Sequence, residues 1–432
     1  MSFTIGIRRE DKNKWERRVS ITPEHVKELK EKHGINTIVQ PSEIRIFKEE
    51  EYKKNGATIS EDLKDANVVF AVKEIPSTFF QKNKTYVFFS HTIKGQDYNM
   101  PMLKKMMELG CNLIDYERIA DEKGRRLVFF GRYAGIAGMI DTLWAFGKRL
   151  EWRGIKTPFG EIKKTIDYNS LEDAKNHIRY IGQKIKEEGI PESLSPIVIG
   201  FAGYGHVSSG AQEILDVLPV EEIGPGQLEA IHEHYTEGVI YKVVFKEKDM
   251  VEPVSSESAF NLEEYYEKPH LYRSIFPQYI RRLSILMNCI YWDERYPRLF
   301  TKDFLEENFT GLMKLQIVGD ISIDINGAIE FTEKSTTPDS PVYVYNPVRR
   351  DVIDGYKGNG VLVMSVDNLP CELPKEASIA FSNSLINFVP SIAKADYSVD
   401  FQRLNLAEEV KKAVILYNGK LTPNYQYINK YL

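Results

Sequence analysis

Cysteine is scarce in this chain, and its scarcity excludes two classes of site. Cys111, Cys289 and Cys371 are the only cysteines among 432 residues, and long segments separate them. They form neither the close pairs of a zinc site nor the framework of a small disulfide-rich protein. We therefore expect three buried, unlinked thiols in a reducing compartment, and no metal cofactor.

An excess of positive charge is also missing. The chain has 57 lysine and arginine residues against 62 aspartate and glutamate residues, a net charge of −5. Nucleic-acid binding requires clustered cationic side chains that neutralise phosphates. Short runs such as Arg8-Arg9 and Arg281-Arg282 indicate a solvated surface or a substrate contact. We predict no nucleic-acid partner.

Long apolar runs are absent too. No stretch approaches the ~18 apolar residues of a membrane-spanning helix. The densely charged segment after residue 7 is not typical of a secretory signal. We therefore expect a cytoplasmic protein without a membrane partner.

The chain does contain a regular alternation of short apolar runs and amphipathic segments. Thr22 and Pro23 are typical of a helix start, and Gly34 of a helix end. In the first part we expect strands at 3–7, 37–40, 68–72, 86–90 and 112–116, and a helix closed by residues 63–66. In the second part we expect a long helix from about Gly135 to Trp152, strands at 196–202, 239–245, 315–323 and 361–365, and a largely helical tail over 372–395 and 406–416. Gly135 and Gly138 are small enough to let the long helix pack closely.

This alternation predicts an α/β fold of two Rossmann-like, doubly wound domains. In such a layout the ligand site is expected in the cleft between the domains, at the carboxyl ends of the strands.

A glycine-rich segment, IVIGFAGYGHVSSG at 197–210, lies between a predicted strand and a predicted helix. Gly203 permits a tight turn, Gly205 lets the backbone approach a pyrophosphate, and the helix N-terminus faces the phosphates. Ser208 stands where the strict dinucleotide pattern has glycine or alanine, so a purely structural turn is the alternative. After the expected next strand, 219–223, neither an acidic ribose clamp nor a phosphate-binding arginine follows, although Glu221 and Glu222 lie just before its end.

Eight further segments occur in an order that resembles one family. They are IGIRRED…WERRVSITPEHV (5–26), AVKEIP (71–76), FFSHTIKGQ (88–96), LIDYERI…GRRLVFFGRYAGIAGMIDTLWAFGKRL (113–150), FAGYGHVSSGAQEILDVLP (201–219), NCIYWDERYPRLFT (288–301), VGDISIDINGAIEFTEKSTT (318–337) and VMSVDNLPCELPKEAS (363–378). Together they resemble lysine–ketoglutarate reductase, the L-lysine-forming saccharopine dehydrogenase, which is related to alanine dehydrogenase and to the transhydrogenase N-terminal fold.

The resemblance implies a domain arrangement and a reaction. Residues 1–132 and 376–432 would form the substrate domain, to which the C-terminal helices return, and residues 133–375 the dinucleotide-binding domain. We expect a stand-alone reductase without a second, glutamate-forming dehydrogenase half. The reaction would condense L-lysine with 2-oxoglutarate and reduce the resulting imine to saccharopine with hydride from NAD(P)H. A homo-oligomer is left open.

The resemblance also assigns residues to roles. Lys73 and His91, at the ends of two expected neighbouring strands, correspond to the acid–base pair. Arg18 and Arg126 correspond to clamps for substrate carboxylates, Glu117 to a carboxylate for the lysine ammonium group, and Asp367 to the wall beside the nicotinamide. The residues expected around the cofactor are Gly203, Tyr204, Gly205, His206, Val207, Ile290, Tyr291, Trp292, Asp320, Ile321, Val366 and Asp367. Trp292 could equally be a core aromatic residue.

Three questions stay open at the level of sequence. The segments NCIYW…PRL and Ala328–Phe331 favour NADP, but the turn after Ile223 leaves NAD against NADP undecided. An alanine dehydrogenase or another opine-forming enzyme of the same fold is the first alternative. A nucleotide-binding module without turnover is the second, and the joint presence of Lys73 and His91 weighs against it.

Overall fold

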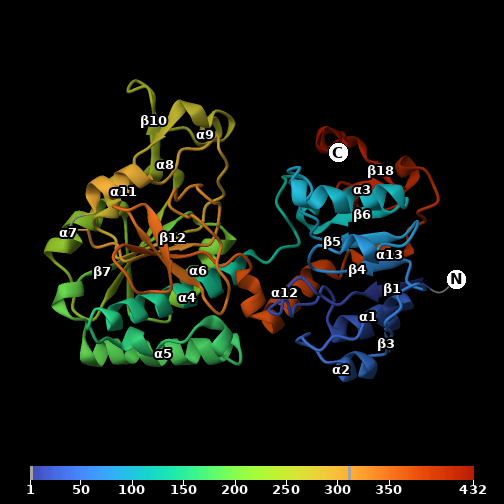
Figure 1. Cartoon of the computed structure of the whole chain (residues 1–432), viewed down its shortest axis with the longest axis horizontal. Helices are drawn as coiled ribbons and strands as arrows, with labels where there is room; N and C mark the ends of the chain where they lie inside the picture. Colours follow the sequence, from blue (N-terminus) through green and yellow to red (C-terminus); the bar gives the residue numbers. More distant parts are fainter. Residues whose placement is uncertain (1–2, 310–312) are drawn as a thin grey trace. The chain divides into compact units, whose positions relative to one another are not determined.

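A computed structural model describes residues 3–309 and 313–432. Contacts divide the chain into two compact units. Unit 1 comprises Met1–Phe130 and Pro374–Leu432, and unit 2 comprises Gly131–Leu373. Figure 1 shows the C-terminal segments, in red, beside the blue N-terminal strands in unit 1. The predicted α/β fold, with C-terminal helices returning to the first domain, is confirmed.

Unit 1 is built on an eight-stranded sheet with the order β18-β17-β6-β5-β4-β1-β2-β3. Its six strands from β6 to β3 are parallel, while β17 and β18 join the β6 edge in antiparallel register. The strands are β1 (Phe3–Ile7), β2 (Ile35–Val39), β3 (Thr58–Ile59), β4 (Val68–Phe70), β5 (Thr85–Phe88), β6 (Asn112–Asp115), β17 (Val414–Tyr417) and β18 (Lys420–Leu421). The helices are α1 (Pro23–His33), α2 (Glu49–Lys54), α3 (Met100–Glu108), α12 (Pro374–Leu385), α13 (Val389–Lys394) and α14 (Glu408–Lys411).

Local sequence accounts for most of these elements. Strands β4, β5 and β6 are buried along their whole length, as expected of parallel strands covered on both faces. Helix α1 begins after the N-cap Thr22 with Pro23 and ends at Gly34, whose φ of 66° suits glycine.

Two expectations for unit 1 are wrong. Residues 63–66 form turns rather than the end of a helix, and 406–416 contains only the short α14 before β17 begins.

Unit 2 carries a second eight-stranded sheet, with the order β15-β14-β16-β13-β12-β7-β9-β8. The strands from β16 to β8 are parallel, and β14 and β15 extend the other edge in antiparallel register. The strands are β7 (Ile197–Ala202), β8 (Val220–Ile223), β9 (Ile240–Phe245), β12 (Ile285–Asn288), β13 (Ile317–Asp320), β14 (Val342–Asn346), β15 (Asp351–Asp354) and β16 (Val361–Met364), with a separate hairpin of β10 (Val251–Pro253) and β11 (Tyr272–Ser274). The helices are α4 (Gly131–Trp152), α5 (Leu171–Glu188), α6 (His206–Leu215), α7 (Leu228–Glu233), α8 (Glu247–Met250), α9 (Leu262–Glu267), α10 (Pro277–Ile280) and α11 (Lys302–Asn308).

Glycines set the position of α6 against α4. A Cβ on Gly135 would lie 1.9 Å from the carbonyl oxygen of Val207, and one on Gly210 would lie 2.0 Å from that of Arg132. A Cβ on Gly138 would lie 2.8 Å from Ile321. The close packing predicted for Gly135 and Gly138 is therefore confirmed, and it fixes the helix that follows the glycine-rich loop.

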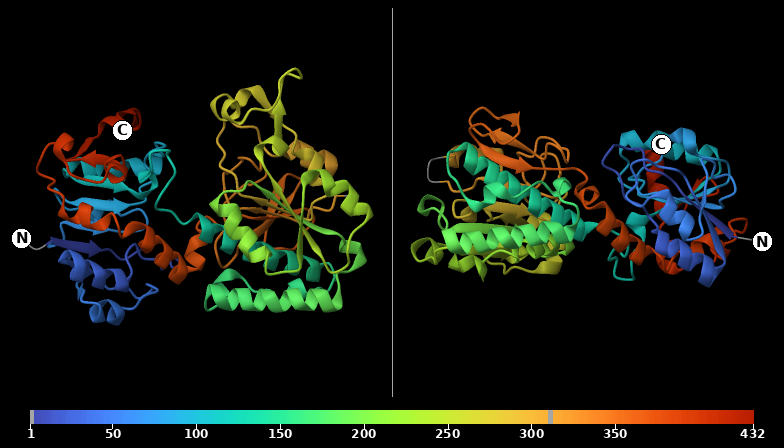
Figure 2. Two further views of the ribbon diagram at one scale, coloured as in Figure 1. Left: turned by 180° about the vertical axis from the view of Figure 1, so that it is seen from behind. Right: turned by 90° about the horizontal axis from the view of Figure 1, so that it is seen from below.

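Helix α5 extends along one side of unit 2 (Figure 2).

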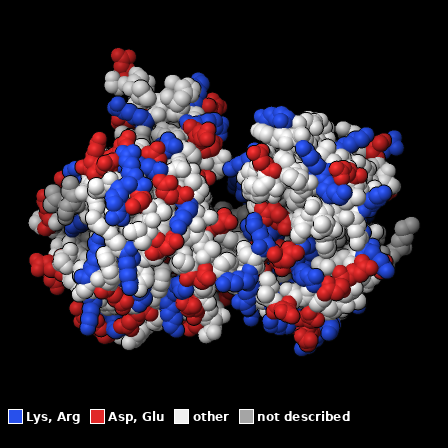
Figure 3. All heavy atoms as spheres, viewed as in Figure 1, with Lys and Arg blue, Asp and Glu red and all other residues white. Residues whose placement is uncertain are grey.

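The molecular surface shows no face of one sign in the view of Figure 3, where lysine and arginine side chains alternate with aspartate and glutamate. Within the part of the chain that the structure describes, no helix is long and apolar enough to cross a membrane.

Candidate active site

Four neighbouring parallel strands of unit 1, β1, β4, β5 and β6, end at the same edge of the sheet. From the segments that follow β1, β4 and β5 we select six charged or titratable residues, which we call the strand-tip cluster: Glu10, Glu16, Arg18, Lys73, Glu74 and His91. Lys73 lies three residues beyond the end of β4, and His91 three residues beyond the end of β5. The structure thus places both predicted acid–base residues at one edge of this sheet.

Lys73 is held by its backbone. The carboxylate of Glu10 accepts hydrogen bonds from the N–H groups of Val72, at 2.7 Å, and Lys73, at 3.0 Å. Burial lowers the pKa of the Lys73 ammonium group, and the positive charge of Arg18 lowers it further. Burial also raises the pKa of Glu10 to about 7, with the charge of Glu16 acting in the same direction. A lysine with a lowered pKa can take up and release a proton closer to neutrality.

His91 is fixed through its side chain. Its Nδ1 lies 2.6 Å from Oε1 of Glu74, and Nζ of Lys12 lies 2.9 Å from Oε2 of the same carboxylate. Burial opposes ionisation of Glu74, but the hydrogen bonds and charges of His91 and Lys12 outweigh it and lower the pKa of Glu74 to about 2. Because an ionised carboxylate only accepts hydrogen bonds, Nδ1 carries a proton, and Nε2 is the nitrogen that can exchange one.

The backbone of His91 adopts a left-handed conformation with φ of 49°, which is unusual for a residue other than glycine. Asp115, at the end of β6, accepts hydrogen bonds from both the backbone N–H, at 3.0 Å, and the hydroxyl of Ser90. The side-chain amide of Asn99 donates to the carbonyl of His91 at 3.2 Å. Such a conformation costs about 1–3 kcal/mol and persists only where neighbours enforce it, often at functional sites.

Arg18 occupies a different environment from the one expected of an open carboxylate clamp. It is 3% exposed, and its guanidinium donates to Glu16 through Nε at 2.8 Å and Nη2 at 2.5 Å. The guanidinium carbon lies 4.2 Å from the ring centroid of Phe130. Glu16 is fully buried. The fork of Arg18 therefore already binds an internal carboxylate, and its positive charge acts on the nearby Lys73.

Arg126 and Glu117, predicted to bind opposite ends of the substrate, form an ion pair with each other. Both line a cavity of about 350 Å³ in unit 1, together with Arg118, Asp121 and Lys412. The backbone N–H of Glu117 is fixed at 2.8 Å from Oδ1 of Asp115. A ligand carboxylate that binds Arg126 would compete with Glu117.

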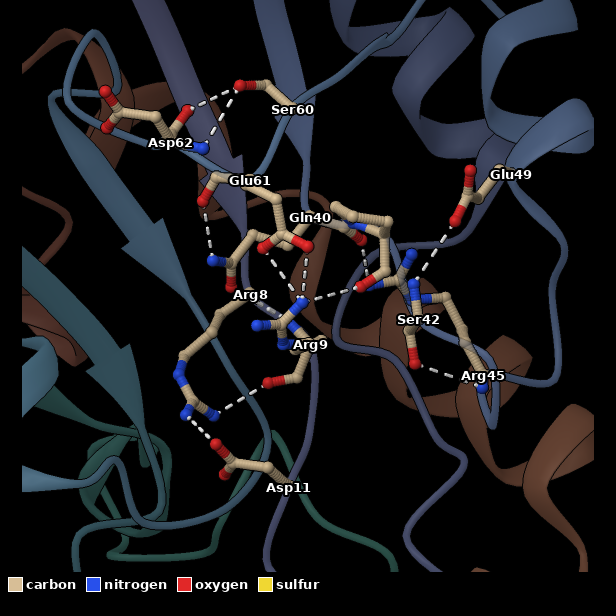
Figure 4. Close-up of polar contacts among 11 residues, drawn as sticks. Arg8, Arg9, Asp11, Gln40, Ser42, Arg45, Glu49, Ser60, Glu61 and Asp62 are labelled. Atoms are coloured by element: carbon tan, nitrogen blue, oxygen red, sulfur yellow. Dashed lines mark hydrogen bonds and ion pairs between the residues drawn. The ribbon is translucent and has the colours of Figure 1, made fainter.

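The basic run after β1 forms ion pairs within unit 1. Arg8 is 4% exposed and donates to Asp11 at 2.5 Å, and Arg9 donates to both carboxylate oxygens of Glu61 at 2.9 Å (Figure 4). Both arginines thus tie the segment that leads from β1 to Glu10 to neighbouring carboxylates.

In unit 2, the glycine-rich loop has the strand–turn–helix geometry expected of it. Gly203 follows β7 with φ of 93°, and Gly205 is the N-cap of the ten-residue helix α6. A Cβ on Gly205 would meet no heavy atom within 4 Å. The backbone there is therefore open on the side where a pyrophosphate would approach the first turn of α6, and the loop fits a dinucleotide.

The remaining residues predicted to line the cofactor lie at or just beyond the carboxyl ends of β12, β13 and β16, which follow β7 in that order across the sheet. They are Ile290, Tyr291, Trp292, Asp320, Ile321, Val366 and Asp367. Ile290 adjoins the loop directly, because a Cβ on Gly203 would lie 3.1 Å from it. Tyr291 is 68% exposed, and Asp367 is exposed as well.

Two of these residues point their side chains into the core. The Trp292 indole belongs to the hydrophobic core of unit 2 and donates to the carbonyl of Tyr296 at 3.1 Å. The carboxylate of Asp320 is 1% exposed and accepts hydrogen bonds from Asn288 at 2.8 Å and Thr332 at 2.6 Å. The Trp292 indole thus packs as a core aromatic ring and the Asp320 carboxylate orders the end of β13, while their place beside a cofactor stays a prediction.

The sequence did not single out four carboxylates of this site: Glu10, Glu16, Glu74 and Asp115. Glu10 and Glu16 lie within the first segment of the family resemblance, Glu74 directly follows Lys73, and Asp115 ends a strand. Their closeness in sequence to the predicted site residues, or to a strand end, could therefore have identified them. Across residues 3–309 and 313–432, no three His, Cys, Asp or Glu side chains form a group that could hold a metal ion.

Two segments of the chain match described protein families. Residues 6–137 match the family described as alanine dehydrogenase/PNT, N-terminal domain, and residues 289–424 match alanine dehydrogenase/PNT, C-terminal domain. The chain therefore belongs to the alanine dehydrogenase/PNT family.

Curated proteins similar to this chain include two kinds of enzyme. The chain is 37% identical to an alpha-aminoadipic semialdehyde synthase of Arabidopsis thaliana over 98% of this chain and 41% of that protein. It is 34% identical to the mitochondrial enzyme of that name from Mus musculus over 99% of this chain and 47% of that protein. A saccharopine dehydrogenase [NAD(+), L-lysine-forming] of Emericella nidulans is 27% identical over 89% of this chain and 91% of that protein. The chain spans less than half the length of the two synthases, and the predicted resemblance is confirmed.

Solved structures agree on the fold. An L-alanine dehydrogenase superposes with a TM-score of 0.63 at 18% identity and covers 99% of both chains. A transhydrogenase from Sinorhizobium meliloti superposes with a TM-score of 0.56 at 15% identity, over 97% of this chain and all of that one.

Proposed function

We propose that this protein is a saccharopine dehydrogenase of the L-lysine-forming type, which condenses L-lysine with 2-oxoglutarate and reduces the adduct to saccharopine. The observation that carries the proposal is the strand-tip cluster, where a lysine of lowered pKa and a histidine held by an ionised glutamate end adjacent strands. The relatives named for saccharopine and aminoadipic semialdehyde chemistry support it.

The chain's own residues would handle protons. The ε-nitrogen of lysine must lose a proton when it attacks the 2-oxoglutarate carbonyl, and the carbinolamine oxygen must gain one before it leaves as water. We assign these transfers to Nζ of Lys73 and Nε2 of His91, with Glu74 keeping the proton on Nδ1. Arg126 would bind a substrate carboxylate, and Glu117 a substrate ammonium group, once their mutual ion pair opens.

A nicotinamide nucleotide, when bound, supplies the hydride that reduces the imine. The residues of this chain that would hold it are Gly203–Val207, Ile290, Tyr291, Ile321, Val366 and Asp367. We favour NADP(H) over NAD(H). No metal takes part in the proposed reaction.

The test is oxidation of NADPH in the presence of 2-oxoglutarate and a panel of amines. We expect a rate with L-lysine that exceeds those with ornithine, alanine and no amine. Pyruvate with ammonia serves as the alanine dehydrogenase control. Equal rates for lysine and alanine, or a rate only with pyruvate and ammonia, would remove lysine as the substrate. Binding of nucleotide without any turnover would favour a binding module.

A substitution in the glycine-rich loop should separate cofactor binding from folding. Gly205→Val should weaken nucleotide binding at least tenfold, because the side chain would enter the space through which a pyrophosphate reaches the backbone. The fold should survive, since that space holds no protein atom within 4 Å and φ is −78°. Gly226→Val is the matched control, because a Cβ there also meets nothing within 4 Å. Calorimetry with unchanged affinity for Gly205→Val would show a purely structural turn.

A further inference from the structure

The order of strands in unit 2 decides which residue lies beside the glycine-rich loop. Strand β9, rather than β8, adjoins β7, and Ala202 is paired with Phe245 at the carboxyl ends of the two strands. The N–H of Gly203 donates to the carbonyl of Phe245 at 3.0 Å. In doubly wound dinucleotide-binding folds, the adenosine ribose lies at the end of the strand beside the loop strand. The ribose position is therefore set by residues after Phe245, and not by the turn after Ile223.

A lysine side chain directly follows the carboxyl end of β9. Strand β9 ends in the apolar residues Val244 and Phe245, and the exposed Lys246 follows. Its ammonium nitrogen lies 5.8 Å from the ring centroid of Tyr204 in the loop. Among the residues that the structure describes, no carboxylate forms an ion pair with this ammonium group.

The nearby carboxylates already have partners, and Glu247 also acts on the hydroxyl of Tyr204 in the loop. Glu247, the next residue, accepts a hydrogen bond from the hydroxyl of Tyr266 at 2.7 Å. Glu222 lies on the edge strand β8 and pairs with Lys242 at 2.9 Å. Glu247 is the carboxylate nearest in sequence to the end of β9, so an acidic clamp for the two ribose hydroxyls, as an NAD site requires, would fall to a group that already binds Tyr266.

We propose that Lys246 binds the 2′-phosphate of a phosphorylated dinucleotide and so selects NADP(H) over NAD(H). A phosphate carries about −1.5 to −2 charges near pH 7, and a lysine ammonium group offers it a point charge with three donors. A ribose without the phosphate gains no such partner. The assignment rests on the proposed use of a nicotinamide nucleotide, and it adds the residue that discriminates between the two forms.

The experiment measures binding to the full chain by calorimetry, so that it does not depend on turnover. The ligands are NADPH, NADH, 2′,5′-ADP and 5′-AMP. The proteins are the parent, Lys246→Glu, Lys246→Met and Lys248→Glu, each checked for folding by thermal unfolding. Lys248 is the matched control because it is also exposed and lies two residues further along the chain.

We expect the parent to bind NADPH at least tenfold more tightly than NADH, and 2′,5′-ADP more tightly than 5′-AMP. Lys246→Met should weaken NADPH binding by about 10- to 100-fold, the loss expected for one charge-assisted hydrogen bond. Lys246→Glu should weaken it further, while NADH binding stays within about twofold in both variants. Lys248→Glu should keep the preference of the parent.

The assignment is overturned if the parent binds both dinucleotides equally, if Lys246→Met keeps the parent's preference, or if Lys248→Glu loses as much as Lys246→Glu. Failure of the proposed nicotinamide-nucleotide site looks different, because the parent then binds none of the four ligands. Failure of the lysine-dependent reaction alone leaves these binding results unchanged.

Discussion

Replacing Lys73 with methionine, or His91 with asparagine, is expected to lower kcat by about 10²–10⁴-fold, the usual contribution of a general acid or base. Methionine keeps much of the lysine volume but cannot titrate. Asparagine removes the imidazole, yet tolerates the left-handed backbone at φ of 49° better than most residues. KM for lysine and 2-oxoglutarate should change less than kcat, because the two groups act on protons in the transition state.

The double variant gives the sharper test. If Lys73 and His91 belong to one proton-transfer unit, the combined loss should be smaller than the product of the single losses. The profile of kcat/KM against pH should be bell-shaped in the parent and lose one limb when His91 is replaced. Lys82→Met and His270→Asn, both at exposed positions, serve as controls. A His91 variant with kcat within twofold of the parent and an unchanged pH profile would remove His91 from the mechanism.

Replacing Arg18 with alanine is expected to lower the stability of unit 1 by about 3–5 kcal/mol, the cost of breaking a buried ion pair from one side. Glu16 is fully buried and would lose the partner that donates to both of its carboxylate oxygens. Amide hydrogen exchange along β1 and β4 measures the effect within this unit. The pair Arg18→Met with Glu16→Leu should recover much of the loss, because no unpaired charge remains buried.

The same variant decides between two roles for Arg18. If stability is unchanged and KM for 2-oxoglutarate rises strongly, Arg18 is the substrate clamp that the family resemblance assigns. If stability falls as expected, its main role is to hold Glu16 and to keep positive charge beside Lys73.

The sequence predicted the parts of the fold that depend on local patterns. Strands such as β4, β5 and β7 are continuous apolar runs because both of their faces are covered, and the start and end of α1 follow from Thr22, Pro23 and Gly34. The glycine-rich turn was predictable for the same reason, since its conformation depends on Gly203 and Gly205 themselves.

Features that depend on distant partners were not predictable in this way. Residues 406–416 have helical spacing, but β17 forms within them because its residues pair with β6, about 300 residues earlier in the sequence. The position of β9 beside β7 is likewise a property of the whole sheet. It is the reason why we propose a ribose position after Phe245 and not after Ile223. The pairing of Arg18 with Glu16 and of Arg126 with Glu117 reflects tertiary geometry that residue type alone does not fix.

The discontinuity of unit 1 has a consequence for synthesis of the protein on the ribosome. Unit 2 is one uninterrupted segment, so it can complete its sheet as soon as Leu373 has emerged. The β6 edge of unit 1 stays uncovered until β17 has been made, and its open backbone groups are available to other strands during that time. Domains generally fold in the order in which they leave the ribosome. Here unit 1, whose synthesis begins first, would finish folding last. The strand-tip residues that follow β4 and β5 are made long before helices α12 and α13, which belong to the same unit.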